Sequence, residues 1–187
     1  MNPRAGATVA LLSLFAAACA ATPARAPAAS DGSGLPERAS VPTAPELCGN
    51  ALDDNGNGLA DEGCGTTTSA ASFLIAWDEP NADVDLRVID PNGELVEVGR
   101  PTESGLVRER DCPGREGECR GKNLESIYQE QGAPAPGKYQ VRVLLVSLGN
   151  AEPPVTVRFN ARLGARAYAA SLSLARVESD WSLVLVL

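Results

Sequence analysis

The chain has 187 residues, a formal net charge of −8 and no histidine. The acidic balance argues against nucleic-acid binding, because that affinity comes from a basic patch that neutralises phosphates. Without histidine, the Ser-His-Asp and Cys-His nucleophile systems are excluded. The sequence also contains neither a glycine-rich phosphate loop nor a dinucleotide fingerprint, so it predicts a protein that is not an enzyme.

The first residues predict an export signal. Residues 1–18 carry one positive charge, at Arg4, and continue into a mostly apolar run that is too short to span a bilayer. The run ends in small residues before Cys19, and this arrangement resembles the lipobox of bacterial lipoproteins. The resemblance implies that Cys19 is acylated and anchors an exported protein to the outer membrane or the cell surface. An ordinary signal peptide cleaved near Ala20 or Ala21 is the alternative.

Residues 19–45 join the lipidation cysteine to a segment rich in alanine, proline and serine. Such a composition cannot bury enough apolar surface to offset the entropy lost on ordering. We therefore expect a disordered, flexible linker that holds the folded part of the chain away from the membrane.

The cysteine count supports export. Five cysteines are an odd number for an exported protein, and assigning Cys19 to a lipid leaves four. Four cysteines allow three connectivities. Pairing Cys48 with Cys64 and Cys112 with Cys119 is favoured, because each couple brackets a turn-rich loop and an oxidising compartment makes disulfides the default.

Residues 46–64 form a short acidic segment that contains the first cysteine couple. Counted from Asp53, oxygen-bearing groups stand at positions 1, 3, 5, 7 and 9 and glycine at position 6, which is the ligand spacing of an EF-hand-type calcium loop. The candidate ligands are the side chains of Asp53, Asn55, Asn57 and Asp61 and the carbonyl group of Leu59. The segment resembles the thrombospondin type 3 repeat and, more closely, a cysteine-flanked metal-binding motif of exported myxobacterial proteins.

Two interpretations of this loop stay open. In the first, it binds calcium with a dissociation constant of about 10⁻⁴–10⁻³ M, because two of its early ligands are neutral asparagines. In the second, it is a disulfide-bridged loop whose Asn and Asp side chains hydrogen-bond only their own backbone in Asx-turns. A Cys48–Cys64 bridge stabilises either form by about 3 kcal/mol in the chain-entropy model.

From residue 71 onward the sequence predicts strands and no helix. Residues 83–89 alternate in polarity, with Val84, Leu86 and Val88 on one face. The other expected strands are 72–77, 94–98, 124–129, 138–146, 155–161, 168–177 and 181–187, and residues 102–122 are expected to form a polar loop. About eight strands separated by turns indicate an all-β, antiparallel, jelly-roll-like β-sandwich over residues 71–187.

Four short strings carry a resemblance that covers about residues 71–187. They are Trp77-Asp78, Asp83-Val84-Asp85-Leu86, Asp90-Pro91-Asn92-Gly93 and Pro136-Gly137-Lys138-Tyr139. Together they resemble the bacterial prepeptidase C-terminal-like β-sandwich domains. With the lipobox, this resemblance implies a non-enzymatic surface lipoprotein whose sandwich is an interaction module stabilised by calcium. The alternative is an accessory domain that binds polysaccharide or protein for an exported hydrolase.

Three aspartates near the second expected strand form a secondary metal candidate: Asp78, Asp83 and Asp85. Asp83 and Asp85 share a strand face, about 7 Å apart, so their repulsion requires compensation. Three interpretations follow: a solvated face balanced by Arg87, a calcium site, or a surface that contacts a ligand directly. Further ligands for a calcium site would be Asp90 and Glu125.

Overall fold

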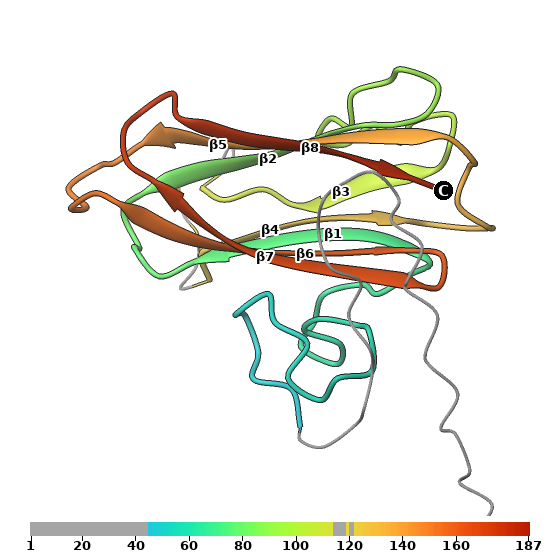
Figure 1. Cartoon of the computed structure of the whole chain (residues 1–187), viewed down its shortest axis with the longest axis horizontal. Helices are drawn as coiled ribbons and strands as arrows, with labels where there is room; N and C mark the ends of the chain where they lie inside the picture. The colour runs from blue at the N-terminus through green and yellow to red at the C-terminus, as the bar shows by residue number, and fades with distance from the viewer. Residues whose placement is uncertain (1–44, 114–118, 120–121) are drawn as a thin grey trace, which may run out of the picture.

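The computed structural model of the chain describes residues 45–113, 119 and 122–187. The expected signal segment 1–18, the lipidation site Cys19 and the linker up to residue 44 lie outside the described residues. Within those residues, eight antiparallel strands form two packed sheets without any helix, which confirms the predicted all-β sandwich (Figure 1). No helix in these ranges is long and apolar enough to cross a bilayer.

One sheet has five strands in the order β3-β4-β1-β6-β7, and the other has three in the order β2-β5-β8. The strands are β1 (Ala71–Trp77), β2 (Asp83–Ile89), β3 (Leu106–Arg110), β4 (Leu124–Gln129), β5 (Lys138–Ser147), β6 (Val155–Leu163), β7 (Arg166–Leu174) and β8 (Asp180–Val186). Neighbouring strands in each sheet are often distant in sequence, so the connections cross from one layer to the other.

The apolar core lies between the two sheets. Val84, Leu86 and Val88 of β2 are fully buried there, as their alternation predicted. The rings of Phe159 and Trp181, from the two facing sheets, pack with their centroids 5.2 Å apart. Aromatic pairs in such tilted arrangements add about 0.5–1.5 kcal/mol to the burial of their surfaces.

β1 lies at the centre of the five-stranded sheet, between β4 and β6. Its apolar run has no alternation because both of its faces are buried. Phe73, Ile75 and Trp77 belong to the core between the sheets. Leu74 and Ala76 belong to a second apolar cluster on the opposite face. That second cluster shows that the outer face of this sheet is covered at β1 and β4.

The predicted turn after β2 is present and shapes the end of that strand. The N–H group of Gly93 donates to the carbonyl of Asp90 at 3.0 Å. Gly93 has a φ of 85°, a conformation that favours glycine. The Asp90 side chain accepts the N–H group of Asn92 at 2.9 Å, which is the Asx-turn expected of this string.

Two segments differ from the predicted strands. Residues 94–98 make isolated bridges and two ladder bonds, from the N–H group of Val96 to the carbonyl of Val88 and from the N–H group of Asp90 to the carbonyl of Glu94. Val96 alone of this segment is buried, so the ladder does not extend further. Residues 106–110, predicted to belong to a polar loop, form β3 at the edge of the five-stranded sheet. Charged residues concealed this strand, since Arg108 is nearly buried in an ion pair described below.

Candidate functional site: the disulfide-bridged loop and the two outer faces

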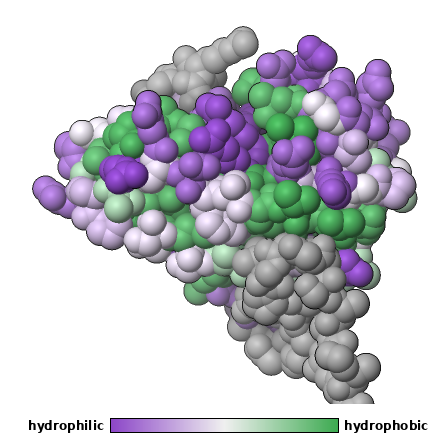
Figure 2. Space-filling view, turned by 45° about the horizontal axis from the view of Figure 1, so that its top comes forward, coloured by the Kyte–Doolittle hydropathy of each residue, from purple (hydrophilic) through white to green (hydrophobic). Residues whose placement is uncertain are grey.

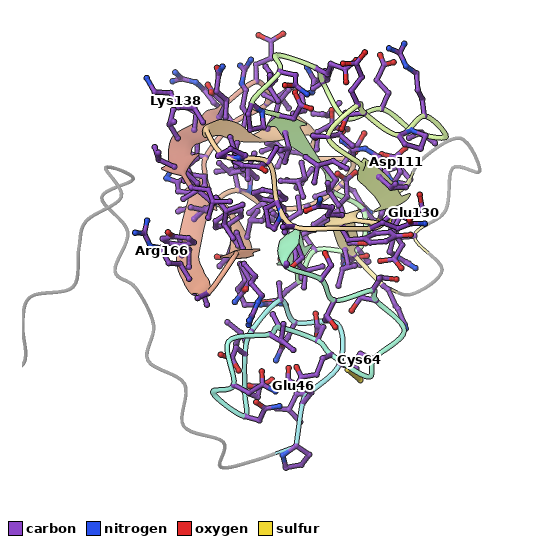
Figure 3. The ribbon with its side chains drawn as sticks, turned by 90° about the vertical axis from the view of Figure 1, so that its right-hand side faces the viewer. Glu46, Cys64, Asp111, Glu130, Lys138 and Arg166 are labelled. Atoms are coloured by element: carbon purple, nitrogen blue, oxygen red, sulfur yellow. A yellow bond between two sulfur atoms is a disulfide. The ribbon has the colours of Figure 1, made fainter. Side chains whose placement is uncertain are left out.

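Residues 46–64 fold into a compact loop closed by the Cys48–Cys64 disulfide, whose Cα atoms are 5.2 Å apart. Figure 3 shows Glu46 and Cys64 in this loop, at the opposite end of the molecule from Lys138 at the start of β5. The second bridge joins Cys112 to Cys119. Both disulfides are the local pairs predicted from the cysteine positions.

Asp53 and Asp61 are buried inside the loop, with 2% and 0% of their surfaces exposed. The Asp53 carboxylate accepts the N–H groups of Asn57 and Gly58, each at 2.9 Å. The Asp61 carboxylate accepts the three N–H groups of residues 49–51 at 2.7–3.3 Å. Charged acceptors form hydrogen bonds about twice as strong as neutral ones, so these two carboxylates hold the loop backbone in its path.

The two asparagines of the predicted calcium set form Asx-turns. Asn55 Oδ1 accepts the N–H group of Asn57 at 2.9 Å. Asn57 Oδ1 accepts the N–H group of Leu59 at 2.8 Å. Contacts of this kind were expected from the second interpretation of the loop, in which polar side chains bond the local backbone.

Glu62 is a loop residue that the sequence reasoning missed. Its Oε1 atom accepts the side-chain amides of Asn55 and Asn57, the latter at 2.5 Å. Its Oε2 atom is buried without a hydrogen-bond partner among the described residues. Glu62 directly follows Asp61, so the Asp-Glu pair was the available signal. Counting from Asp53 at EF-hand spacing passes over it.

Glu46 connects the beginning of the loop to its middle and its end. Its two carboxylate oxygens accept the N–H groups of Asn55 at 3.1 Å and of Asp61 at 2.9 Å. Desolvation raises the pKa of Glu46 above its ordinary value, and the nearby charges of Glu62 and Asp54 act in the same direction, whereas the two N–H groups lower it. Three acidic side chains, Glu46, Asp54 and Glu62, thus lie close enough to influence one another.

The fit of calcium to this loop can be judged from these contacts. The described residues contain no group of three or more His, Cys, Asp or Glu side chains arranged to hold a metal ion. Both oxygens of Asp53 and Oδ2 of Asp61 accept one N–H group each, so each of them has a second lone pair for a cation, whereas Oδ1 of Asp61 already accepts two N–H groups. Glu62 Oε2 is a buried oxygen that such a cation would satisfy. Calcium binding by the loop stays a prediction.

The loop packs against the outer face of the five-stranded sheet (Figure 1). Ala51 and Ala60 of the loop form an apolar cluster with Leu74 and Ala76 of β1 and Leu124 of β4. Each buried methylene contributes about 0.8 kcal/mol, so even this small cluster stabilises the attachment. The loop is therefore part of the folded unit and does not hang free of the sandwich.

Two arginines of β6 also hold the loop. Arg158 donates to the Asn50 carbonyl at 2.6 Å and to both carboxylate oxygens of Asp78 at 2.7 and 3.0 Å. Arg162 donates to the Gly58 carbonyl at 3.2 Å. Arg158 and Arg162 are an even number of residues apart, so their side chains leave the same face of the sheet and fasten the loop at two points.

The three aspartates of the secondary metal candidate lie in different surroundings. The hydrogen bond from Arg158 keeps the pKa of Asp78 below its ordinary value. Asp85 pairs with Arg87 at 2.8 Å, the contact that the arginine-balanced interpretation predicted. Burial and then the neighbouring charge of Asp85 raise the pKa of Asp83. Arginines thus balance the charges of Asp78 and Asp85.

Glu125, named above as a further ligand, lies between the two sheets with 1% of its surface exposed. Its Oε2 atom accepts Nη1 of Arg108 and the N–H group of Leu86, each at 2.7 Å. Arg108 also donates to the Leu86 carbonyl and, at 3.3 Å, to Asp111. Desolvation raises the pKa of Glu125 to about 8, although Arg108 lowers it. The pair joins β3 and β4 to β2 in the opposite layer.

The outer face of the three-stranded sheet carries a shallow depression of about 490 Å³. Its lining includes Arg87, Ile89, Leu95, Arg142 and Val184. Leu95 is 45% exposed and Val184 39%, and Arg142 pairs with Asp180 at 3.0 Å. Figure 2, in which this layer is turned forward, shows hydrophobic and hydrophilic residues interleaved on the visible surface.

No family model, curated protein or solved structure matches this chain. The resemblances to lipoproteins, to the cysteine-flanked metal-binding motif and to prepeptidase C-terminal-like domains therefore depend on the sequence strings alone. The eight-stranded sandwich, the two disulfides and the attached loop come from the structure itself.

Proposed function

We propose that the chain is an exported, lipid-anchored and non-enzymatic interaction module that binds its partner on the outer face of the three-stranded sheet. One observation carries this proposal: the disulfide-bridged loop covers the outer face of the five-stranded sheet at β1 and β4, whereas a depression lies open on the other outer face. Concave surfaces with apolar floors and a few placed polar groups are typical of binding sites.

The lining of the depression favours a polypeptide partner. It combines aliphatic side chains, such as Ile89 and Leu95, with two arginines and contains no aromatic residue. Arginine is enriched at protein interfaces, whereas stacking on a sugar ring would require an aromatic platform that this lining lacks. We therefore place an extracellular protein ahead of a polysaccharide as the partner of this module.

Arrays of matrix proteins and of glycans, probed with the full chain, test the binding face. We expect capture by a protein, weakened at least ten-fold by Leu95→Glu, which places a charge on the apolar floor. Leu47→Glu is the matched control, because Leu47 is 65% exposed on the disulfide-bridged loop, away from the depression. Binding to glycans alone, or equal loss in both variants, would contradict the proposal.

The anchor is tested separately by fractionating cells that express the Cys19→Ser variant. Acyl chains hold a protein on a membrane through their buried methylenes, so the variant should move from the membrane fraction to the soluble fraction. If Cys19→Ser stays in the membrane fraction, Cys19 is not the anchor.

A further inference from the structure

β8 forms one edge of the three-stranded sheet, because it pairs with β5 alone. Gly137 and Leu187 exchange both of their backbone hydrogen bonds, so odd-numbered residues of β8 direct their N–H and C=O groups toward β5. The backbone N–H and C=O groups of the even-numbered residues consequently point away from the sheet; these residues are Ser182, Val184 and Val186. Unpaired groups along an edge are a template for another strand.

The other edge of this sheet and the neighbouring edge of the five-stranded sheet are protected. Beside β2, the N–H group of Val96 bonds the carbonyl of Val88. β3 has a register shift between Arg108 and Arg110, and such irregularities discourage pairing. By contrast, residues 181–187 include no charged residue and no proline, and β8 pairs with β5 without a register shift. β8 is thus an edge that lacks the usual protection.

We propose that β8 pairs antiparallel with β8 of a second copy of this chain, about a two-fold axis at Val184. The two three-stranded sheets would then form one continuous sheet. In this register Val184 faces Val184 of the other copy, and Ser182 faces Val186. An interface between identical copies must be self-complementary, and here no charged residue opposes another. This self-complementarity is the reason to choose a second copy over an unrelated strand.

The contacts at the end of β8 are compatible with this pairing. Nη1 of Arg166, at the start of β7, donates to the Val186 carbonyl at 3.3 Å. A carbonyl oxygen accepts two hydrogen bonds, so this contact leaves room for a strand donor. Pairing also covers the exposed side chain of Val184, which adds apolar burial to the backbone bonds.

Net charge sets the salt dependence of this association. Each copy carries a formal charge of −8, so two copies repel each other at low ionic strength. Salt shortens the Debye length to about 8 Å at 0.15 M and about 3 Å at 1 M. The dimer should therefore tighten as salt is added, the opposite of an interface held by surface ion pairs.

Sedimentation equilibrium of the full chain at concentrations from about 1 to 100 μM, a common range for specific dimers, tests the proposal. We expect a monomer–dimer equilibrium. Val184→Lys should weaken dimerisation at least ten-fold, because it places two lysines opposite each other. Gln140→Lys is the matched control, since Gln140 lies opposite Val184 on β5, away from the edge, and should leave the dissociation constant unchanged. A chain that stays monomeric throughout this range would overturn the proposal.

Two further measurements exclude misfolding as the cause. Ser182→Pro removes an N–H group that points away from β5, so it should abolish the dimer and leave the circular dichroism spectrum of the monomer intact. Mixing Val184→Lys with Val184→Glu should restore a dimer, because opposite charges then meet. Failure of this mixture to dimerise, or a dimer unaffected by Ser182→Pro, also counts against the pairing. Leu95→Glu, which tests the binding face, should leave the dimer unchanged.

Discussion

The two outer faces of the sandwich come from similar strands but differ in what covers them. On the five-stranded sheet, Leu74 and Leu124 face outward and pack against the disulfide-bridged loop. On the three-stranded sheet, Arg87 and Arg142 face outward and pair with aspartates at the surface. Outward-facing leucines of the five-stranded sheet are thus buried where the loop excludes water, whereas the outward-facing arginines of the three-stranded sheet stay at the surface.

Opening the disulfide that closes the loop should have the largest effect on the free energy of unfolding. The double variant Cys48→Ser, Cys64→Ser frees a loop closed over 16 residues, so the free energy of unfolding should fall by about 3 kcal/mol. Urea denaturation measures this loss, and binding of a hydrophobic dye should increase as Leu74 becomes exposed. Replacing Cys112 and Cys119, which are 7 residues apart, should cost about 0.7 kcal/mol less. Equal losses in the two double variants would contradict the loop-closure account.

The stability that Glu125 contributes where it links the two sheets should depend on pH. The pKa of Glu125 is raised from 4.5 to about 8, so the folded state keeps a proton that the unfolded state releases. Its contribution is complete below pH 4.5 and is lost as the pH rises to about 8.

Glu125→Gln mimics the protonated side chain and tests this pH dependence. Relative to the wild type, the variant should become progressively more stable as the pH rises from 4.5 to about 8, because only the wild type loses a proton in this range. Thermal unfolding across this pH range measures the difference. Glu130→Gln, at an exposed position next to the end of β4, should show no such trend. Parallel curves for wild type and Glu125→Gln would refute the assignment.

Two arginine–aspartate pairs allow the faces to be compared directly. Arg158→Ala removes bonds to Asp78 and to the Asn50 carbonyl beneath the loop, and should cost about 1–2 kcal/mol. Arg142→Ala removes an exposed pair with Asp180 and should cost less than about 1 kcal/mol. Hydrogen exchange should accelerate in loop residues 46–64 for Arg158→Ala only. Unchanged loop exchange in that variant would mean that the apolar cluster alone holds the loop.

Calcium should have the smallest effect. With a dissociation constant of about 10⁻⁴–10⁻³ M, calcium at about 2 mM would stabilise the folded state by about 0.6–1.8 kcal/mol. The rise in melting temperature should disappear in Asp53→Asn and Asp61→Asn and decrease in Glu62→Gln. Asp83→Asn serves as the control for the secondary candidate. A rise in melting temperature that is lost only in Asp83→Asn would place the calcium site on β2. If the wild type shows no rise, the Asx-turn interpretation of the loop is the correct one.

Sequence periodicity predicted the strands whose neighbours follow a simple rule. In β2 and β5, one face contacts the core and the other water, so alternation alone identified Val84 and Leu86 as core residues, and both are fully buried. β3 was missed because Arg108 is nearly buried in a pair with Glu125, which is remote in sequence. Residues 94–98 have strand-like composition, but Val96 is their sole buried side chain, which is too little to stabilise a full ladder.

The disulfide-bridged loop was likewise predicted from the sequence only in part. The cysteine spacing predicted both disulfides, since short turn-rich segments close with little loss of entropy. The polar pattern from Asp53 to Asp61 predicted a turn-rich structure, and the Asx-turns are present. No local pattern indicated that the loop would pack against Leu74 and accept a hydrogen bond from Arg158. These contacts depend on how distant strands are ordered in the sheet.

For the part of the chain that the structure describes, the sequence by itself determined the all-β fold, the two local disulfides and which strand faces enter the core. These properties follow from side-chain alternation and turn chemistry over short distances. Only the tertiary structure decided which outer face is covered, where Glu125 finds its partner and which strand is left at an edge. Each of these depends on strand order, which joins residues far apart in the chain and is absent from any local pattern.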